Sequence, residues 1–394
     1  MILNYLMPAR IIMGENCFFE QRKLLRELGQ KALIITGKNS ARINGAYDDV
    51  VKTLEANNQD HIIFDRVTAN PTDICVEEAG KLAKEKQCDF IVAIGGGSAM
   101  DAGKAAAILA LNDISKEEMF NLNFNKTLPV ATIPTTAGTG SETTPYSVLV
   151  DTTETDGKTP KASGPAKRSI GSPLLFPKYA FLDAKYLRSL SRNTTVHTAI
   201  DALSHGVESM LTLRANYLSN VLARESISMI MDCMNALLAF PQEPSSFPRE
   251  KREKLLLASA IAGMVIAQTG TAAPHSMGYH FTLNWGTDHG RANGLLMKSF
   301  ISWYREKENA LNKEKSSFPL RIPALCDALG MDLEKFFPKL EKLLGQREKA
   351  SETELIAWSA LPMKNAANTN IQPNKEEILT IYRKSVGLQA PTGS

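Results

Sequence analysis

The chain has 394 residues, of which 43% are hydrophobic and 22% charged, with a formal net charge of +3 at neutral pH. At ~100–200 residues per domain, this length predicts two domains with enough core to fold without disulfides. The near-neutral charge argues against a nucleic-acid or a membrane-surface partner. Five scattered cysteines without a CxxC pair indicate reduced thiols and a cytoplasmic protein.

Short apolar runs alternate with helical patterns through the first half of the chain. The expected strands are 32–36, 62–64, 90–94, 129–133 and 179–182, and the helices between them are 48–57, 75–86 and 101–111. This alternation predicts an α/β domain built on a parallel, doubly wound, Rossmann-like sheet with helices on both faces. The polar stretch 152–173 interrupts the pattern, and we expect a hairpin or loop there.

Long helical patterns replace the strands after about residue 183. Among them are 195–211, 216–240, 249–268 and 290–305. The uncharged stretch 255–274 is long enough to span a bilayer, but its six alanines favour a small-residue helix packed inside the protein. We therefore predict an α/β domain over 1–185, an all-α domain over 186–386 and a disordered tail over 387–394.

The segment FIVAIGGGSAMDAGKA is the most informative part of the first half. Gly95, Gly96 and Gly97 leave an apolar strand, and a helix is expected to begin near Ser98. Glycines let the backbone approach a diphosphate closely, and free N–H groups at the helix start attract its charge. A tight turn without a ligand is the alternative. The segment is not a Walker loop, because Lys104 is followed by alanine and the glycine spacing is too long.

A second polar loop, PTTAGTGSE, follows the expected strand 129–133. Its glycines allow the backbone to bend around a ligand, and its hydroxyls can donate to one. The hydroxyl-bearing residues are Thr135, Thr136, Thr139 and Ser141. Together with the glycine turn, this loop predicts a nucleotide cleft at the end of a doubly wound sheet.

The third pattern is a possible metal site built from a helical pair and two downstream histidines. Asp201 and His205 are spaced i, i+4 on an expected helix, which places both on one face. His275 is expected at the end of the alanine-rich helix, and His289 in a loop that opens the next helix. One oxygen and three nitrogen ligands would leave room for a substrate oxygen. A lone histidine is more often a satisfied core residue, which is our interpretation of His61 and His197.

The motifs GGGSAMDAGKA, PTTAGTGSE and DALSHGVES, followed by the two downstream histidines, resemble in order and spacing the iron-containing (group III) alcohol dehydrogenases. The resemblance runs from about residue 8 to 382. It implies a dehydroquinate synthase-like fold, an ion between the two domains, and a homodimer or larger assembly. The ligand roles carry over to Asp201, His205, His275 and His289. Coenzyme contacts carry over to Gly95, Gly96, Gly97, Ser98, Asp101, Thr135, Thr136, Thr139 and Ser141.

Two positions depart from the family pattern. Many members carry a proton-relay histidine four residues after the third ligand, where this chain has Tyr279. The tyrosine hydroxyl is one turn from His275 and is our candidate relay, whereas His280 is rotated away on a continuous helix.

The second departure concerns the coenzyme. Where members that prefer NAD place an acidic residue, this chain has Gly37, followed by Lys38, Asn39 and Ser40. A carboxylate repels a 2′-phosphate, whereas glycine leaves space that neighbouring donors can fill. We therefore predict NADP(H) over NAD(H).

The resemblance implies an oxidoreductase that moves a hydride between NAD(P)(H) and a small primary alcohol or aldehyde. The ligand set suits Fe²⁺, with Zn²⁺ or Mn²⁺ as alternatives. The aromatic residues Phe281, Trp285 and Tyr146 are candidates either for an apolar pocket or for the core. Three other functions remain open: a dehydroquinate-synthase-type lyase, a maleylacetate- or glycerol-type oxidoreductase, and a non-catalytic protein that binds a dinucleotide and a metal.

Overall fold

The computed structural model describes residues 4–152, 166–240, 243–314, 320–361 and 363–388. The strands are β1 Arg10–Met13, β2 Lys31–Gly37, β3 Asp60–Val67, β4 Phe90–Gly95, β5 Val130–Pro134, β6 Tyr146–Asp151, β7 Ala166–Gly171, β8 Tyr179–Leu182, β9 Lys349–Ala350 and β10 Gly387–Leu388. The helices of the first half are α1 Cys17–Glu20, α2 Ser40–Ile43, α3 Ala46–Ala56, α4 Asp73–Glu85, α5 Gly97–Leu111 and α6 Lys116–Phe120.

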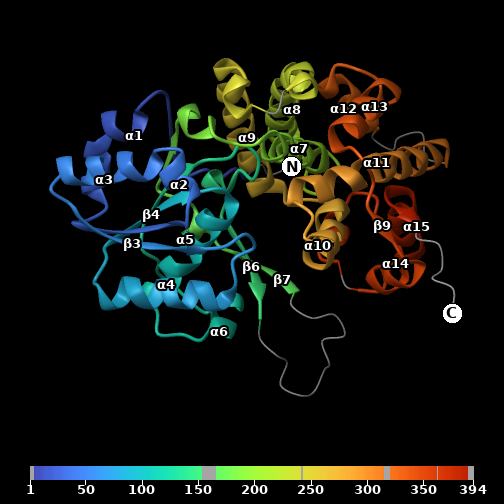
Figure 1. The fold of residues 1–394 in the computed structure, drawn as a ribbon. Coiled ribbons are helices and arrows are strands. Elements are labelled where there is room, and N and C mark those ends of the chain that lie inside the picture. Colours follow the sequence, from blue (N-terminus) through green and yellow to red (C-terminus); the bar gives the residue numbers. More distant parts are fainter. Residues whose placement is uncertain (1–3, 153–165, 241–242, 315–319, 362, 389–394) are drawn as a thin grey trace.

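The remaining helices follow β8. They are α7 Arg192–Met210, α8 Tyr217–Ala239, α9 Arg249–Thr269, α10 Ala273–Trp285, α11 His289–Glu314, α12 Ile322–Leu329, α13 Leu333–Leu344, α14 Glu352–Ser359 and α15 Lys375–Ser385. Short 3-10 helices occupy Arg22–Glu27 (η1), Ser141–Thr143 (η2), Pro173–Leu175 (η3), Ala184–Leu187 (η4), Pro244–Ser246 (η5) and Ala366–Asn368 (η6). Figure 1 shows the α/β half in blue to green beside the helical half, which runs from yellow-green to red.

Six parallel strands form the central sheet in the order β1-β8-β5-β4-β2-β3. Side chains of β2 alternate between the two faces: Leu33 and Ile35 pack with the core under α4 and α5, and Ala32 and Ile34 pack with the core under α3. The expected doubly wound parallel sheet with helices on both faces is therefore confirmed.

The strand order reverses at β2, because β3 lies on one side of it and β4 on the other. In doubly wound sheets, ligands bind at the carboxyl ends of the strands that flank such a switch point. Here β2 ends at Gly37 and β4 ends at Gly95. Both coenzyme segments expected from the sequence thus follow the carboxyl ends of two neighbouring parallel strands.

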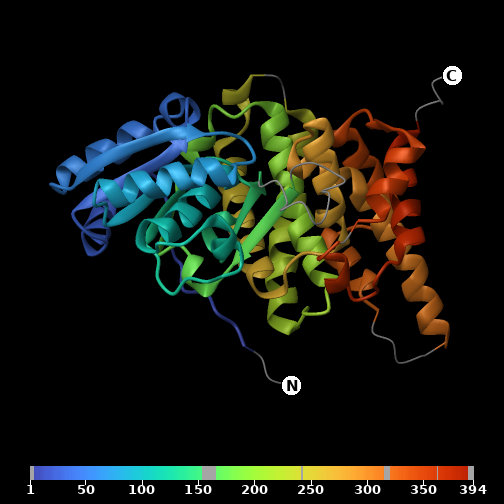
Figure 2. The ribbon, with the colours of Figure 1, turned by 90° about the horizontal axis from the view of Figure 1, so that it is seen from below.

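The helical half packs around α7, which is buried from Val196 onward apart from a few side chains near its start. Both α8 and α9 pack on it, and α11 covers another side. Figure 2 shows the same two halves from below. Among the described residues, no single helix is long and apolar enough to cross a membrane. Only taken together are α9 and α10 long and apolar enough to span a bilayer, and the two helices are bent by 114° relative to each other.

Several expectations from the sequence need correction. The strands β1, β6 and β7 were not expected, and β6 pairs antiparallel with β7. Only β7 falls within 152–173, where a hairpin or loop was expected, because β6 ends at Asp151. Residues 153–165 lie outside the described part. Strands also occur after residue 183, since β9 pairs with β10. The tail therefore begins ordered at Gly387–Leu388, and its remainder, 389–394, lies outside the described residues.

The alanine-rich helix α9 ends one residue after the expected 249–268, and so stops short of His275, which was expected at its end. Its last residue is Thr269, and Gly270 follows with φ +67°, a conformation that favours glycine and stops a helix. A new helix, α10, begins at Ala273 with Pro274 in its first turn, the position at which proline is best tolerated. His275 therefore lies in the first turn of α10 and not at the end of α9. The domain boundary at residue 185 stays a prediction.

Candidate metal and coenzyme site

Three histidines from three helices lie around one carboxylate oxygen, that of Asp201. We call these residues together the four-residue cluster: Asp201 and His205 on α7, His275 on α10 and His289 on α11. The Asp201 Oδ1 atom lies 4.0 Å from Nε2 of His205, 3.8 Å from Nε2 of His275 and 3.9 Å from Nε2 of His289. Ligand atoms around a tetrahedral ion with bonds of ~2.1 Å lie roughly 3.5 Å apart, so the cluster fits a divalent cation.

The most compact part of the cluster is formed by Asp201, His205 and His275, whose ligand atoms all lie within 4.8 Å of one another. Burial lowers the pKa of His205 and of His275 to about 4. Desolvation also holds the pKa of His289 well below its ordinary value. Neutral imidazoles present a free lone pair, which is the form that binds a metal.

Two further residues, which the sequence analysis missed, support the cluster. A hydrogen bond of 2.6 Å joins Glu208 Oε1 to Nδ1 of His275, so the Nε2 atom of that ring faces Asp201. Asn293 Nδ2 donates to Asp201 Oδ1 at 3.0 Å. Both could have been found by helical spacing, because Glu208 is seven residues after Asp201 and Asn293 is four after His289.

Tyr279 lies beside the cluster, as its sequence position implied. Its ring is stacked on His289 with a centroid separation of 5.7 Å, and the ammonium of Lys167 on β7 lies 5.1 Å from the Tyr279 ring centroid. Burial raises the pKa of Tyr279 above its ordinary value, so the phenol keeps its proton at neutral pH. His280 points elsewhere, with its ring stacked on Trp358 at 5.6 Å.

The glycine turn and the second loop contact each other. A Cβ atom at Gly96 would lie 3.0 Å from Thr136 Oγ1, and one at Gly97 would lie 2.9 Å from Thr139 Cγ2. The backbone N–H of Thr135 donates to the Gly95 carbonyl at 2.9 Å. Helix α5 begins at Gly97 with no side chain capping its first N–H groups, which suits an anionic ligand.

The second loop also packs closely against the helical half. A Cβ atom at Gly138 would lie 2.5 Å from the carbonyl oxygen of Thr198, which precedes Asp201 by three residues on α7. The second loop and α7 therefore meet at a boundary in which there is no room for a side chain at Gly138.

A second contact of this loop is formed with α9, and we call it the seam: Gly140, Thr143, Ala260 and Gly263. A Cβ atom at Gly140 would lie 2.5 Å from the Gly263 Cα atom. Thr143 Oγ1 donates to the Ala260 carbonyl at 2.8 Å. The seam joins the α/β half directly to the helical half.

Asp101 is turned into the protein. Its Oδ1 accepts a 2.6 Å hydrogen bond from Ser141 Oγ, and its Oδ2 accepts one of 2.9 Å from the Val148 backbone N–H. Burial raises its pKa. These contacts make Asp101 an anchor of the second loop, and the same holds for the Ser141 hydroxyl.

The segment after β2 lies at the switch point. A Cβ atom at Gly37 would lie 3.2 Å from the Val67 carbonyl and 3.8 Å from Ser40 Oγ. Arg42, a little further on, pairs with Asp65 at 3.6 Å and stacks on the Tyr47 ring. The donors left near Gly37 are those of Lys38, Asn39 and Ser40.

The aromatic residues considered for a pocket belong mainly to the core. Phe281 is fully buried and packs against Trp285 and Trp358 with ring centroids 4.7 and 5.9 Å away. Tyr146 donates its hydroxyl to the Ile266 carbonyl at 3.3 Å. Of the two possibilities for Phe281, the structure supports the core.

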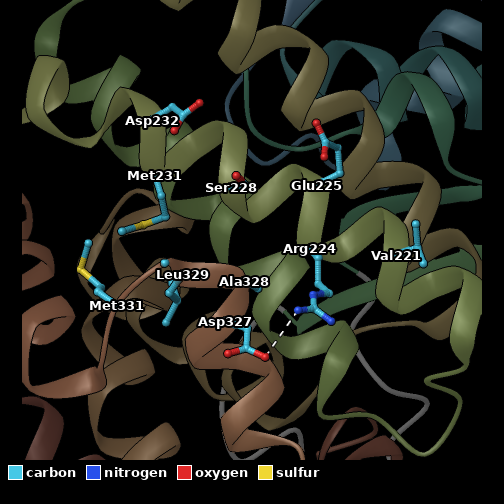
Figure 3. A pocket seen from close by; sticks show the side chains of 11 residues that line it. Val221, Arg224, Glu225, Ser228, Met231, Asp232, Asp327, Ala328, Leu329 and Met331 are labelled. Atoms are coloured by element: carbon cyan, nitrogen blue, oxygen red, sulfur yellow. Dashed lines mark hydrogen bonds and ion pairs between the residues drawn. The ribbon is translucent and has the colours of Figure 1, made fainter.

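A large open cavity lies away from this site. It has a volume of about 590 Å³ and lies between α8 and the turn from α12 to α13. Figure 3 shows its charged rim, where Arg224 and Asp327 pair at 3.5 Å. None of its lining residues belongs to the four-residue cluster or to either loop.

Two family models match the chain. One, for iron-containing alcohol dehydrogenase, matches residues 8–184, and the other, for the C-terminal part of the Fe-containing alcohol dehydrogenase family, matches residues 195–386. A structure of an iron-containing alcohol dehydrogenase from Thermotoga maritima is 35% identical, with a TM-score of 0.83, and covers 98% of this chain and 99% of that one.

Two curated relatives extend the comparison. The 1,3-propanediol dehydrogenase of Klebsiella pneumoniae is 28% identical over 97% of both chains. The probable alcohol dehydrogenase EutG of Salmonella typhimurium is 32% identical, and the match spans 66% of this chain and 64% of EutG, just under two thirds of that relative.

Proposed function

The chain belongs to the family of iron-containing alcohol dehydrogenases, and from this we propose that it transfers a hydride between a nicotinamide dinucleotide and a small primary alcohol or aldehyde. One observation carries the proposal: the second loop meets α7 at Gly138 and Thr198, one turn from Asp201. A nucleotide held by the loops is thereby brought next to the place where a substrate oxygen would be polarised.

For the metal, we propose all four residues of the cluster as ligands. Their donor set, one carboxylate and three neutral imidazoles, suits Fe²⁺, Zn²⁺ or Mn²⁺. A cation bound there supplies Lewis-acid polarisation of the oxygen that it contacts. The residues of this chain orient the donors, since Glu208 holds the His275 ring and Asn293 holds the Asp201 carboxylate.

We propose that the dinucleotide lies across the switch point between β2 and β4. Its diphosphate would lie against Gly96, Gly97 and the start of α5, and the hydroxyls of Thr136 and Thr139 would line the path to the metal.

The preference for NADP(H) rests on Gly37. The absence of a carboxylate there removes a charge that would repel a 2′-phosphate, and Lys38 and Ser40 follow in the sequence as donors. Some relatives carry names that point to the other coenzyme, such as the NAD-dependent methanol dehydrogenase of Bacillus methanolicus. The preference is therefore a property to be measured on this chain.

Tyr279 is our candidate for the proton relay. Its phenol is protonated at neutral pH, and its ring lies against His289, so it can hold a proton at the edge of the cluster. The nearby ammonium of Lys167 favours transient loss of that proton.

We further propose that the protein is a homodimer in the cytoplasm. Size-exclusion chromatography with light scattering would measure the size of the assembly.

The experiment that tests the function follows NADPH and NADH oxidation with butanal, after chelation and reloading with Fe²⁺ or Zn²⁺. We expect metal-dependent turnover that His205→Ala abolishes and His61→Ala leaves unchanged. No turnover with either coenzyme over a panel of aldehydes would favour the lyase or the non-catalytic alternative.

A further inference from the structure

Lys104 is a fully buried lysine on α5, two turns after the glycine turn. Its Nζ donates to the backbone carbonyls of Ser141 at 2.6 Å, Tyr146 at 2.8 Å and Thr144 at 3.0 Å. The hydroxyls of Ser141 and Thr144 lie 2.8 and 3.3 Å away. One ammonium thus holds five oxygen atoms from residues 141–146, which run from the end of the second loop to the first residue of β6.

These contacts exclude a direct role at a phosphate. An ammonium has three protons, and the five protein oxygens around Lys104 already exceed that number. Burial lowers the pKa of Lys104 to about 8, which leaves the side chain charged at neutral pH. A buried charge persists only where hydrogen bonds compensate for its lost hydration. The loop carbonyls supply this compensation, so the charge and the loop path depend on each other.

Asp101, one turn earlier on α5, strengthens the same attachment. It accepts from the Ser141 hydroxyl at 2.6 Å and from the Val148 backbone at 2.9 Å. The Ser147 hydroxyl donates to the Asp101 backbone carbonyl at 2.8 Å. Helix α5 therefore holds residues 141–148, which comprise the end of the second loop, the segment after it and the start of β6.

We propose that Lys104 is a positioning residue for the coenzyme, which acts by holding the second loop so that its hydroxyls face the glycine turn. The position of the loop determines the contacts of Thr136 with Gly96 and of Thr139 with Gly97. The proposal rests on the proposed function, because it takes the two loops as the dinucleotide site. Lys104 touches neither the coenzyme nor the substrate.

The test uses Lys104→Met in the full chain, with Kd values measured by fluorescence titration for NADPH and for NADH. We expect both dinucleotides to bind at least tenfold more weakly, by the same factor, with the Zn²⁺ Kd within threefold of wild type. Lys104→Arg should not restore binding, because a guanidinium spreads its donors and does not fit around one point. The control is Lys84→Met, an exposed lysine paired with Asp113, which should stay within twofold.

Three outcomes overturn the proposal. A lowered Tm with unchanged dinucleotide Kd shows a role in stability alone. Weakened binding that Lys104→Arg rescues shows a direct contact with phosphate. If Lys104→Met does not fold, Ser141→Ala tests the same attachment, and an unchanged dinucleotide Kd in that variant contradicts the proposal. A wild-type chain that binds neither dinucleotide overturns the proposed function itself, a result distinct from the others.

Discussion

Glu208 Oε1 lies 2.6 Å from Nδ1 of His275, in a buried hydrogen bond between α7 and α10. Because the bond sets the direction of the imidazole, Glu208→Gln should weaken metal binding by about 10–100-fold. Competition between the protein and a coloured chelator for Zn²⁺ measures this without any turnover. The matched control is Glu225→Gln on the exposed face of α8, and equal affinities for the two variants would contradict the prediction.

Tyr279→Phe removes the candidate proton relay and keeps the ring on His289. We expect kcat to fall by about 100-fold, near the lower end of what a positioned acid or base contributes, with the coenzyme Kd unchanged. Tyr279→His should retain activity and move the pH optimum down, because an imidazole ordinarily titrates near pH 6.5. Tyr217→Phe, at an 84% exposed position, is the control. Full activity in Tyr279→Phe would remove this residue from the proton path.

Gly37→Asp places a carboxylate at the end of β2, where the sequence has none. The ratio of kcat/KM for NADPH over NADH should fall at least tenfold, because the new charge repels a 2′-phosphate and can accept from a ribose hydroxyl. The control is Asn44→Asp, which adds the same charge seven residues later and preserves the hydrogen bond from the Ala46 N–H. An unchanged ratio in Gly37→Asp would show that the preference is set elsewhere.

Glu142→Gln should gain stability over wild type as the pH rises. Burial raises the pKa of Glu142 to about 7, so the folded chain holds its proton more tightly than the unfolded chain does. Wild-type stability is therefore lost as the pH rises from about 4.5 through 7, and glutamine avoids that loss. We expect similar Tm values near pH 4.5 and an advantage on the order of 2 kcal/mol at pH 8. Exposed Glu55→Gln should show no such trend in differential scanning fluorimetry.

Gly263→Ala tests the seam. The added methyl would lie 2.3 Å from Thr143 Oγ1 and 2.4 Å from the Gly140 carbonyl, so either the loop or α9 must move. We expect a loss of about 1–3 kcal/mol in stability, together with weaker dinucleotide binding. Gly387→Ala is the control, since its methyl would meet Lys349 at an ordinary 3.5 Å. A Gly263→Ala variant that matches this control in both Tm and Kd would show that the contact is dispensable.

The sequence predicts the sheet well where strands are buried on both faces. The buried runs of β2, β4 and β5 stand out, because every residue along them after Lys31 is apolar or small. In contrast, β1 was missed, since its four residues are half exposed and show no alternation. The break between α9 and α10 had a readable signal in Gly270 and Pro274, which the alanine-rich composition obscured.

The candidate site was predictable to a different depth in its different parts. Asp201 and His205 follow helical spacing, and the downstream histidines follow the family motif. Helical spacing places Glu208 on the same face of α7 as Asp201, but its hydrogen bond to His275, 67 residues away, depends on the tertiary fold and could not be predicted. The sequence analysis used Lys104 only to exclude a Walker loop. Its role depends on backbone carbonyls, and these carry no sequence signal.

The seam has a consequence for how the molecule moves. Enzymes with two halves often admit and release a nucleotide by opening about a hinge between them. Here the loop that would have to swing is tied to α5 by Lys104 and to α9 by direct backbone contact at Gly140 and Gly263. The α/β half and the helical half are held together directly at this contact. The position of the second loop relative to α7 and α9 is therefore set when the chain folds.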